Sequence, residues 1–177
     1  MSEGTIKNHA ASVSGSLLDA RELAAATPRS LLATFEAILA ELRGRQVVRT
    51  NDAPAGQYAE WLSCEVLGGA LAPNSEKSFD LFDGAGRKIQ VKSRVLRNGS
   101  RSERQLSPFR SFGFDVALVL LFDTQYRVVH AVEFTTDQVQ ALSTHRTHVN
   151  GHVLIATDNA LSEGVDVIEL FAAPPVG

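Results

Sequence analysis

The run from Asp115 to Phe122 constrains the fold of this chain more than any other segment, because nearly every residue in it is apolar. A strand with one face in solvent alternates apolar and polar residues, whereas a strand covered on both faces does not. We therefore expect a central strand here, with other elements packed on both of its sides. The run is much shorter than the ~20 apolar residues that cross a bilayer, so we expect no membrane span.

Two helices are expected before the strands begin. Residues 16–26 are rich in Ala and Leu and suit a short first helix. The second should begin at Pro28, with Thr27 as its N-cap, and end at Gly44. Six apolar residues of this second helix fall on one face at helical spacing, and we expect that stripe to be core. The stripe consists of Leu31, Leu32, Phe35, Ile38, Leu39 and Leu42.

A third helix and a β-hairpin follow. The helix should start after an N-cap at Asp52 and stop at Gly68-Gly69. Residues 78–82 and 87–95 then suit two strands joined by the turn sequence Asp-Gly-Ala-Gly over 83–86.

The rest of the chain completes one α/β domain with a mixed sheet flanked by helices. We expect a disordered tail over 1–15, a helical extension over 16–50 and the main domain over 51–177. Further strands are predicted over 126–134, 153–156 and 165–170, and a short helix over 136–142.

The charge distribution is uneven along the chain. Eight basic residues and one acid lie between Arg87 and Arg110, so this segment carries +7 while the whole chain carries −3. The remainder therefore carries −10. A local basic segment on an acidic body can bind a phosphate backbone, because affinity follows the field at the contact. A solvated basic loop is the alternative interpretation.

The second hairpin strand carries the candidate catalytic and metal-binding side chains. Gln90, Lys92 and Arg94 share one face of it, since side chains alternate along a strand. If the loop has three residues, Asp80 lies directly opposite Gln90; an even loop would shift the pairing by one. With the odd loop, a carboxylate, an amide carbonyl and an ammonium group meet on one face. Oxygen ligands of this kind suit Mg²⁺.

In that arrangement, Asp80 is the anionic ligand, and the Gln90 carbonyl and the Val91 backbone oxygen are neutral ligands. Lys92 would orient or deprotonate the attacking water and offset charge that builds on the phosphate. Mn²⁺ is the expected substitute for Mg²⁺.

Ser78-Phe79-Asp80 followed by Gln90-Val91-Lys92 resembles the PD-(D/E)XK nuclease superfamily in its D…QxK form, as in the Mrr-like and resolvase-like branches. The resemblance implies a restriction-endonuclease-like fold and a magnesium-dependent endonuclease acting on DNA. It also implies a metal-ligand role for Glu60 on the preceding helix, and a homodimer as a family-level expectation. The basic residues expected to hold the DNA backbone are Arg94, Arg97, Arg101, Arg104 and Arg110.

Two other functions fit the same sequence. One is a nucleic-acid-binding module of this fold without catalysis, and the other is a regulatory domain that binds an acidic protein. His145, His148 and His152 are interpreted as loop histidines, because Asn150-Gly151 breaks the spacing of a zinc site. The lone cysteine, Cys64, is expected to pack in the third helix. Together with a polar N-terminus, it favours a cytoplasmic protein.

Overall fold

The apolar run forms strand β4 (Val116–Phe122), and all seven of its residues are buried. The computed structural model describes residues 19–50, 54–73 and 75–172. Alternate side chains of β4 enter two separate apolar clusters, with Leu118 and Leu120 on one side of the sheet and Val119 and Leu121 on the other. The prediction of a strand covered on both faces is confirmed.

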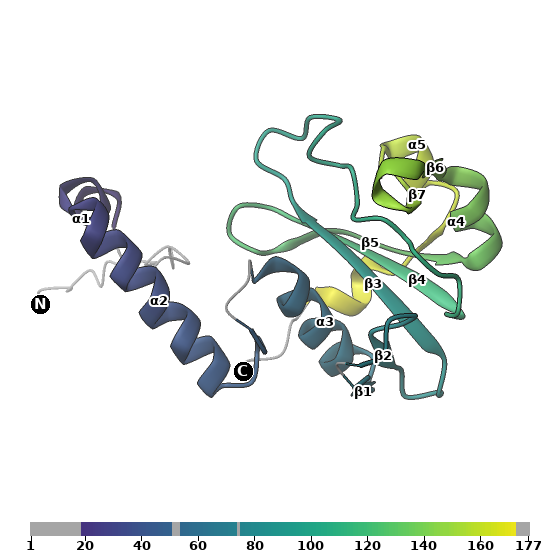
Figure 1. The fold of residues 1–177 in the computed structure, drawn as a ribbon, viewed down its shortest axis with the longest axis horizontal. Coiled ribbons are helices and arrows are strands. Elements are labelled where there is room, and N and C mark those ends of the chain that lie inside the picture. The colour runs from purple at the N-terminus through teal and green to yellow at the C-terminus, as the bar shows by residue number, and fades with distance from the viewer. Residues whose placement is uncertain (1–18, 51–53, 74, 173–177) are drawn as a thin grey trace, which may run out of the picture.

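Six strands form one mixed sheet in the order β1-β2-β3-β4-β5-β8 (Figure 1). Strand β4 pairs parallel with β3, and every other pair of this sheet is antiparallel. The parallel pair requires the chain to cross back over the sheet, and residues 96–115 do so without forming a helix. The other strands are β1 (Ala70–Leu71), β2 (Leu81–Phe82), β3 (Lys88–Val95), β5 (Val128–Thr135) and β8 (Val165–Asp166).

Helices flank the sheet on both faces. Ala59 and Leu62 of α3 belong to the cluster around Leu118, whereas Val139 of α4 belongs to the cluster around Val119. The helices are α1 (Ala20–Ala25), α2 (Pro28–Gly44), α3 (Ala55–Val66), α4 (Thr136–Leu142) and α5 (Asp158–Leu161), with 3-10 helices η1 (Thr147–Val149) and η2 (Ile168–Phe171). A separate two-stranded sheet pairs β6 (Thr144–Arg146) with β7 (Gly151–Val153). The chain is thus a single α/β domain with a mixed sheet flanked by helices.

Local capping explains where two of the helices start. The Thr27 hydroxyl accepts a hydrogen bond from the Ser30 backbone N–H at 3.2 Å, and Pro28 takes the first helical position of α2. Helix α4 has a capping box in which Thr135 and Gln138 each accept from the other's backbone N–H. The predicted bounds of α2 and α4 are confirmed. No helix in the described part of the chain is long and apolar enough to cross a membrane.

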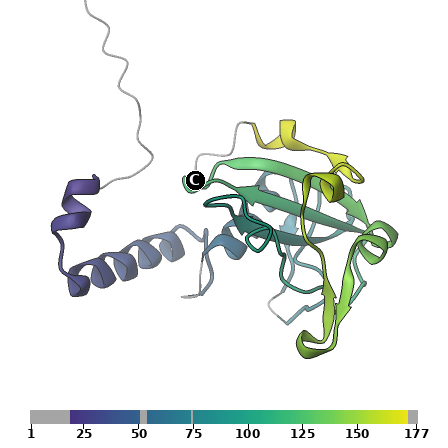
Figure 2. The same ribbon diagram turned by 90° about the horizontal axis from the view of Figure 1, so that it is seen from above.

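The prediction that the apolar stripe of α2 is core is wrong for most of its length. Leu31, Phe35 and Ile38 are 38%, 44% and 47% exposed, whereas Leu39 is 1% exposed. Figures 1 and 2 show the reason: α2 extends away from the sheet and approaches the body only near its C-terminal end. Helical periodicity identifies an apolar face, but it does not supply a neighbouring element to cover that face.

The C-terminal strands are shorter than predicted. Strand β8 ends at Asp166 and pairs with Val132 and Glu133 of β5. The chain then forms η2, which buries Phe171 in the cluster with Leu118. Leu154 and Ala156 are buried, but residues 154–156 bond to the crossover segment instead of extending β7. The Leu106 N–H, for example, donates to the Leu154 carbonyl at 3.0 Å.

Four predicted features lie outside the described residues or side chains. They are the tail over 1–15, the start of the first helix over 16–18, the N-cap Asp52 and the side chain of Leu32.

The burial pattern predicts a large difference between two strand positions. Leu120→Ala should lower the free energy of unfolding by about 2–5 kcal/mol, because it opens a cavity in fully buried β4. Val129→Ala, on the exposed face of β5, should change it by only about 0.5 kcal/mol. Urea unfolding of both variants measures the difference, and equal effects would contradict the assigned burial.

Candidate active site

The turn between β2 and β3 sets the register of the site. Leu81 pairs with Ile89, and the Asp83 N–H donates to the Arg87 carbonyl at 3.0 Å, which closes a three-residue loop. Gly86 supplies the positive φ of +82° that this turn needs. The odd-length loop is therefore confirmed, and it places Asp80 opposite Gln90.

Asp80 is held by hydrogen bonds from the facing strand. Its Oδ2 accepts from the Val91 backbone N–H at 2.7 Å and from Nε2 of Gln90. These bonds and the charge of Lys92 favour the carboxylate, but burial outweighs them and raises the pKa of Asp80. The Gln90 amide thus supports Asp80 through its nitrogen, while its carbonyl is the atom that a metal ion would take.

Glu60 reaches the same place from α3. Its Oε2 accepts from Nη2 of Arg49 at 2.6 Å, and both side chains are partly buried. Burial, together with the neighbouring charge of Asp80, raises the pKa of Glu60, although Arg49 and Lys92 act in the opposite direction. The two carboxylates are therefore close enough to repel one another, which is the condition that a bound cation relieves.

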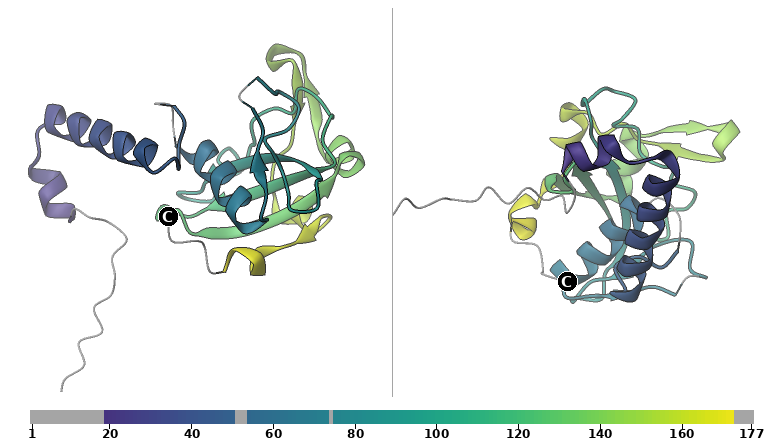
Figure 3. Two further views of the ribbon diagram at one scale, coloured as in Figure 1. Left: turned by 90° about the horizontal axis from the view of Figure 1, so that it is seen from below. Right: turned by 90° about the vertical axis from the view of Figure 1, so that its left-hand side faces the viewer.

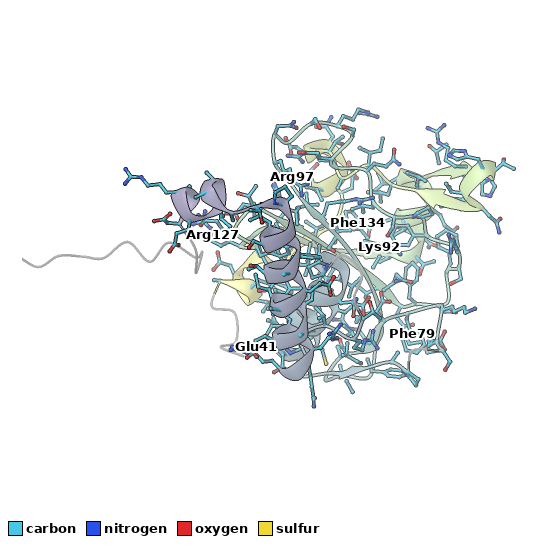
Figure 4. The ribbon with its side chains drawn as sticks, turned by 60° about the vertical axis from the view of Figure 1, so that its left-hand side comes forward. Glu41, Phe79, Lys92, Arg97, Arg127 and Phe134 are labelled. Atoms are coloured by element: carbon cyan, nitrogen blue, oxygen red, sulfur yellow. The ribbon has the colours of Figure 1, made fainter. Side chains whose placement is uncertain are left out.

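Lys92 completes the constellation. Its Nζ lies 5.0 Å from the centre of the Phe109 ring, an arrangement that favours the charged amine. Burial nevertheless lowers the pKa of Lys92, and Arg110 acts in the same direction, while Asp80 and Glu60 oppose both. Figure 4 shows Lys92 near the middle of the α/β body, between the labelled positions of Arg97 and Phe79.

These side chains share one open cavity of about 610 Å³. A second cavity of about 380 Å³ has Glu60 and Asp80 in its lining as well. The two carboxylates therefore stand between two solvent-accessible spaces, so a small ion and a larger ligand could approach them from different sides. The first cavity includes Glu60, Asp80, Gln90, Val91, Lys92 and Arg94 among its lining residues.

The five arginines expected to hold phosphate lie in different environments. Arg94 and Arg97 line the first cavity, and Nε of Arg94 donates to the Gln105 carbonyl at 2.6 Å. Arg101 and Arg110 are exposed. Arg104 is only 17% exposed and bonds to the Ala156 carbonyl and the Asp158 carboxylate, so it ties the crossover segment to the C-terminal region.

Sequence reasoning assigned no role to two neighbours of the site. Arg49 pairs with Glu60 from the segment after α2, and Phe109 lies beneath Lys92 from the crossover segment. A basic residue after a helix and an aromatic residue in a loop are both common, so no local pattern marks either one.

The histidines and the cysteine resemble structural residues more than ligands. The prediction of loop histidines is wrong for His145 and His152, which lie on the paired strands β6 and β7. Asn150 does make the expected turn, with a φ of +47°. Cys64 packs against the cluster around Leu118, and burial raises the pKa of its thiol. Within the described residues, no group of three His, Cys, Asp or Glu side chains could hold a metal ion.

The donor set still fits a hard cation that retains water. Glu60 and Asp80 supply carboxylate oxygens, Gln90 supplies an amide oxygen, and the cavity leaves room for further oxygen ligands. The raised pKa values of both carboxylates show that Arg49 and Lys92 do not fully offset their burial.

Asp80→Asn should raise the free energy of unfolding of the metal-free protein at pH 8. The pKa of Asp80 is higher in the folded than in the unfolded protein, so the folded state binds more protons and loses stability as the pH rises through that pKa. The gain should shrink as the pH falls toward about 3.9, the ordinary aspartate pKa. Urea unfolding in EDTA at several pH values measures it.

Asp83→Asn is the matched control, and its effect on stability should have the opposite sign. Burial raises the pKa of Asp83, but bonds from Arg87 outweigh burial and lower it. This variant should therefore lose stability at pH 8. A gain for Asp80→Asn that does not depend on pH would contradict the assignment.

No protein-family model matches the chain, and no curated protein matches it either.

Proposed function

We propose that this protein is a divalent-metal-dependent endonuclease that hydrolyses phosphodiester bonds in DNA. The observation that carries the proposal is the meeting of Asp80, Gln90 and Lys92 with Glu60 in one open cavity. Three of these residues come from one hairpin, but Glu60 comes from a separate helix, so their meeting does not follow from local sequence.

The order of elements supports a restriction-endonuclease-like fold as part of the proposal. Helix α3 precedes the hairpin β2–β3, and the buried strand β4 follows it in the chain and lies beside β3 in the sheet. The nuclease family that the hairpin motif resembles has a helix, a strand, a hairpin strand and a buried strand in this order.

Each residue has a distinct role in the proposed reaction. Asp80, Glu60 and the Gln90 carbonyl would hold Mg²⁺ or Mn²⁺. The ion supplies Lewis acidity, which polarises the phosphoryl oxygen and acidifies bound water. Lys92 orients the attacking water, and its lowered pKa makes Nζ lose a proton more readily than an ordinary lysine does.

The charge around the cavity suits a phosphodiester. Arg94 and Arg97 line the cavity beyond Lys92 along the chain and would hold the phosphates that flank the scissile one. Contacts of this kind position the backbone without selecting a sequence.

Cleavage assays test the proposal directly. Plasmid, linear, single-stranded and branched DNA are incubated with Mg²⁺ or Mn²⁺, and the wild type should cut at least one of them. Lys92→Ala should reduce the rate by about 10²–10⁴-fold, because it removes an acid–base group, and Asp80→Ala should bring it to background. Activity that survives both changes would contradict the site.

Lys88→Ala is the matched control for Lys92→Ala. Lys88 lies on the same strand four residues earlier, is exposed, and has its Nζ 5.6 Å from the Phe79 ring instead of lining the cavity. Its removal should leave cleavage within about twofold. Salt-sensitive DNA binding without cleavage in either metal would instead support the non-catalytic binding module.

Metal binding provides a test that does not depend on turnover. Mn²⁺ titration followed by calorimetry should show binding to the wild type and to Lys88→Ala but none to Asp80→Asn. Arg49→Met should tighten binding by roughly fivefold, because Arg49 competes for Glu60 and a neighbouring unit charge is worth ~1 kcal/mol even in water. Equal affinity for wild type and Asp80→Asn would contradict the proposed ligand set.

A further inference from the structure

The β6–β7 hairpin (residues 144–153) projects from the α/β body, as Figures 2 and 3 show. Its strands pair antiparallel, with Thr144 opposite Val153 and His145 opposite His152. The residues over 144–148 are exposed, and the contacts of this arm are with β7: its strand pairing and the His145 ring, whose centre lies 5.2 Å from that of His152. This arm does not contribute to the core, so its presence is not explained by packing.

The exposed arm is entirely polar, and no acidic residue lies near it in the sequence. Its residues are Thr144, His145, Arg146, Thr147 and His148, and the chain contains no Asp or Glu between Asp137 and Asp158. In the part of the chain that the structure describes, Arg146 forms no ion pair. The arm therefore presents hydrogen-bond donors and positive charge to solvent, which suits a polyanion and not an apolar or basic partner.

The base of the hairpin is joined to the candidate active site. Phe109 and His152 exchange two backbone hydrogen bonds, each of 2.8 Å, so β7 is paired with the crossover segment. The Phe109 ring is the one that lies 5.0 Å from Nζ of Lys92. Phe109 thus contacts both the proposed catalytic lysine, Lys92, and the β6–β7 hairpin.

The junction is built for close approach of the two backbones. A Cβ on Gly151 would lie 2.8 Å from the Phe109 carbonyl oxygen and 2.9 Å from Cβ of Pro108. Only glycine allows this contact, and the turn before it depends on the left-handed conformation of Asn150. The position of the hairpin beside Lys92 is therefore determined by specific residues.

We propose that the β6–β7 hairpin is a second DNA-binding element that contacts the duplex beside the scissile phosphate, with Arg146 and His148 as its principal contacts. The inference rests on the proposed function, since it assumes that DNA occupies the site at Lys92. A two-stranded ribbon is narrow enough to enter the major groove of B-form DNA. Arg94 and Arg97 then hold the strand from the cavity, while the hairpin holds it from the side of Phe109.

Binding of a fluorescent 30-base-pair duplex tests this inference. Anisotropy is measured in EDTA, so that no cleavage occurs, over a series of salt concentrations. The double variant Arg146→Ala/His148→Ala should weaken binding about tenfold or more and reduce the slope of log affinity against log salt by about one. Both side chains are exposed, so the variant should unfold at the same urea concentration as the wild type.

Arg21→Ala provides the matched control. Arg21 is also an exposed arginine, but it lies on α1, far from the hairpin in Figures 1 and 2. This variant should bind the duplex as the wild type does. Equal losses for Arg21→Ala and for the double variant would overturn the inference, because the effect would then be one of net charge.

The outcomes separate this inference from the proposal on which it rests. If the wild type binds and cleaves DNA but the double variant binds equally well, the hairpin inference fails and the nuclease stands. If the wild type binds duplex without cleaving it, catalysis fails, and the double variant still decides the role of the hairpin. If the wild type does not bind duplex at low salt, the hairpin inference fails, and the cleavage assay on single-stranded and branched DNA still decides the nuclease proposal.

Discussion

The burial of β4 on both faces is the constraint on which the rest of the structure depends. Its seven residues separate two apolar clusters, one closed by α3 and η2 and the other by α4 and the crossover segment. Because β4 pairs parallel with β3, the chain must cross the sheet between them. That crossover carries Phe109 to Lys92, so the pairing that builds the core also completes the site.

The position of the site depends equally on the parity of one turn. A strand shifted by one residue would turn every side chain to the opposite face, and Asp80 would no longer meet Gln90. Bonds within the turn prevent this shift, because Asp83 accepts from the backbone N–H groups of Ala85 and Arg87 as well as from the Arg87 side chain. A tight turn built on one carboxylate therefore aligns a second carboxylate three residues away.

Burial shifts the protonation equilibria of the candidate site. In water, the carboxylates of Glu60 and Asp80 would ionise without a desolvation cost. In this cavity, burial raises the pKa of both carboxylates and lowers the pKa of Lys92. Arg49 and Lys92 offset part of that cost, and a divalent cation would offset more. The cavity thus concentrates groups with shifted pKa values, a feature that is common at catalytic centres.

The sequence by itself determined the elements whose signals are local, and the tertiary structure decided which of them meet. The continuous apolar run specified β4, Thr27 and Pro28 specified the start of α2, and the turn sequence over 83–86 specified a hairpin. The structure decided that its loop has three residues and that Asp80 therefore faces Gln90. Contacts between distant segments left no such pattern. The exposure of Phe35, the ion pair of Arg49 with Glu60 and the projection of the β6–β7 hairpin depend on how elements pack, and a one-dimensional periodicity does not encode a neighbour.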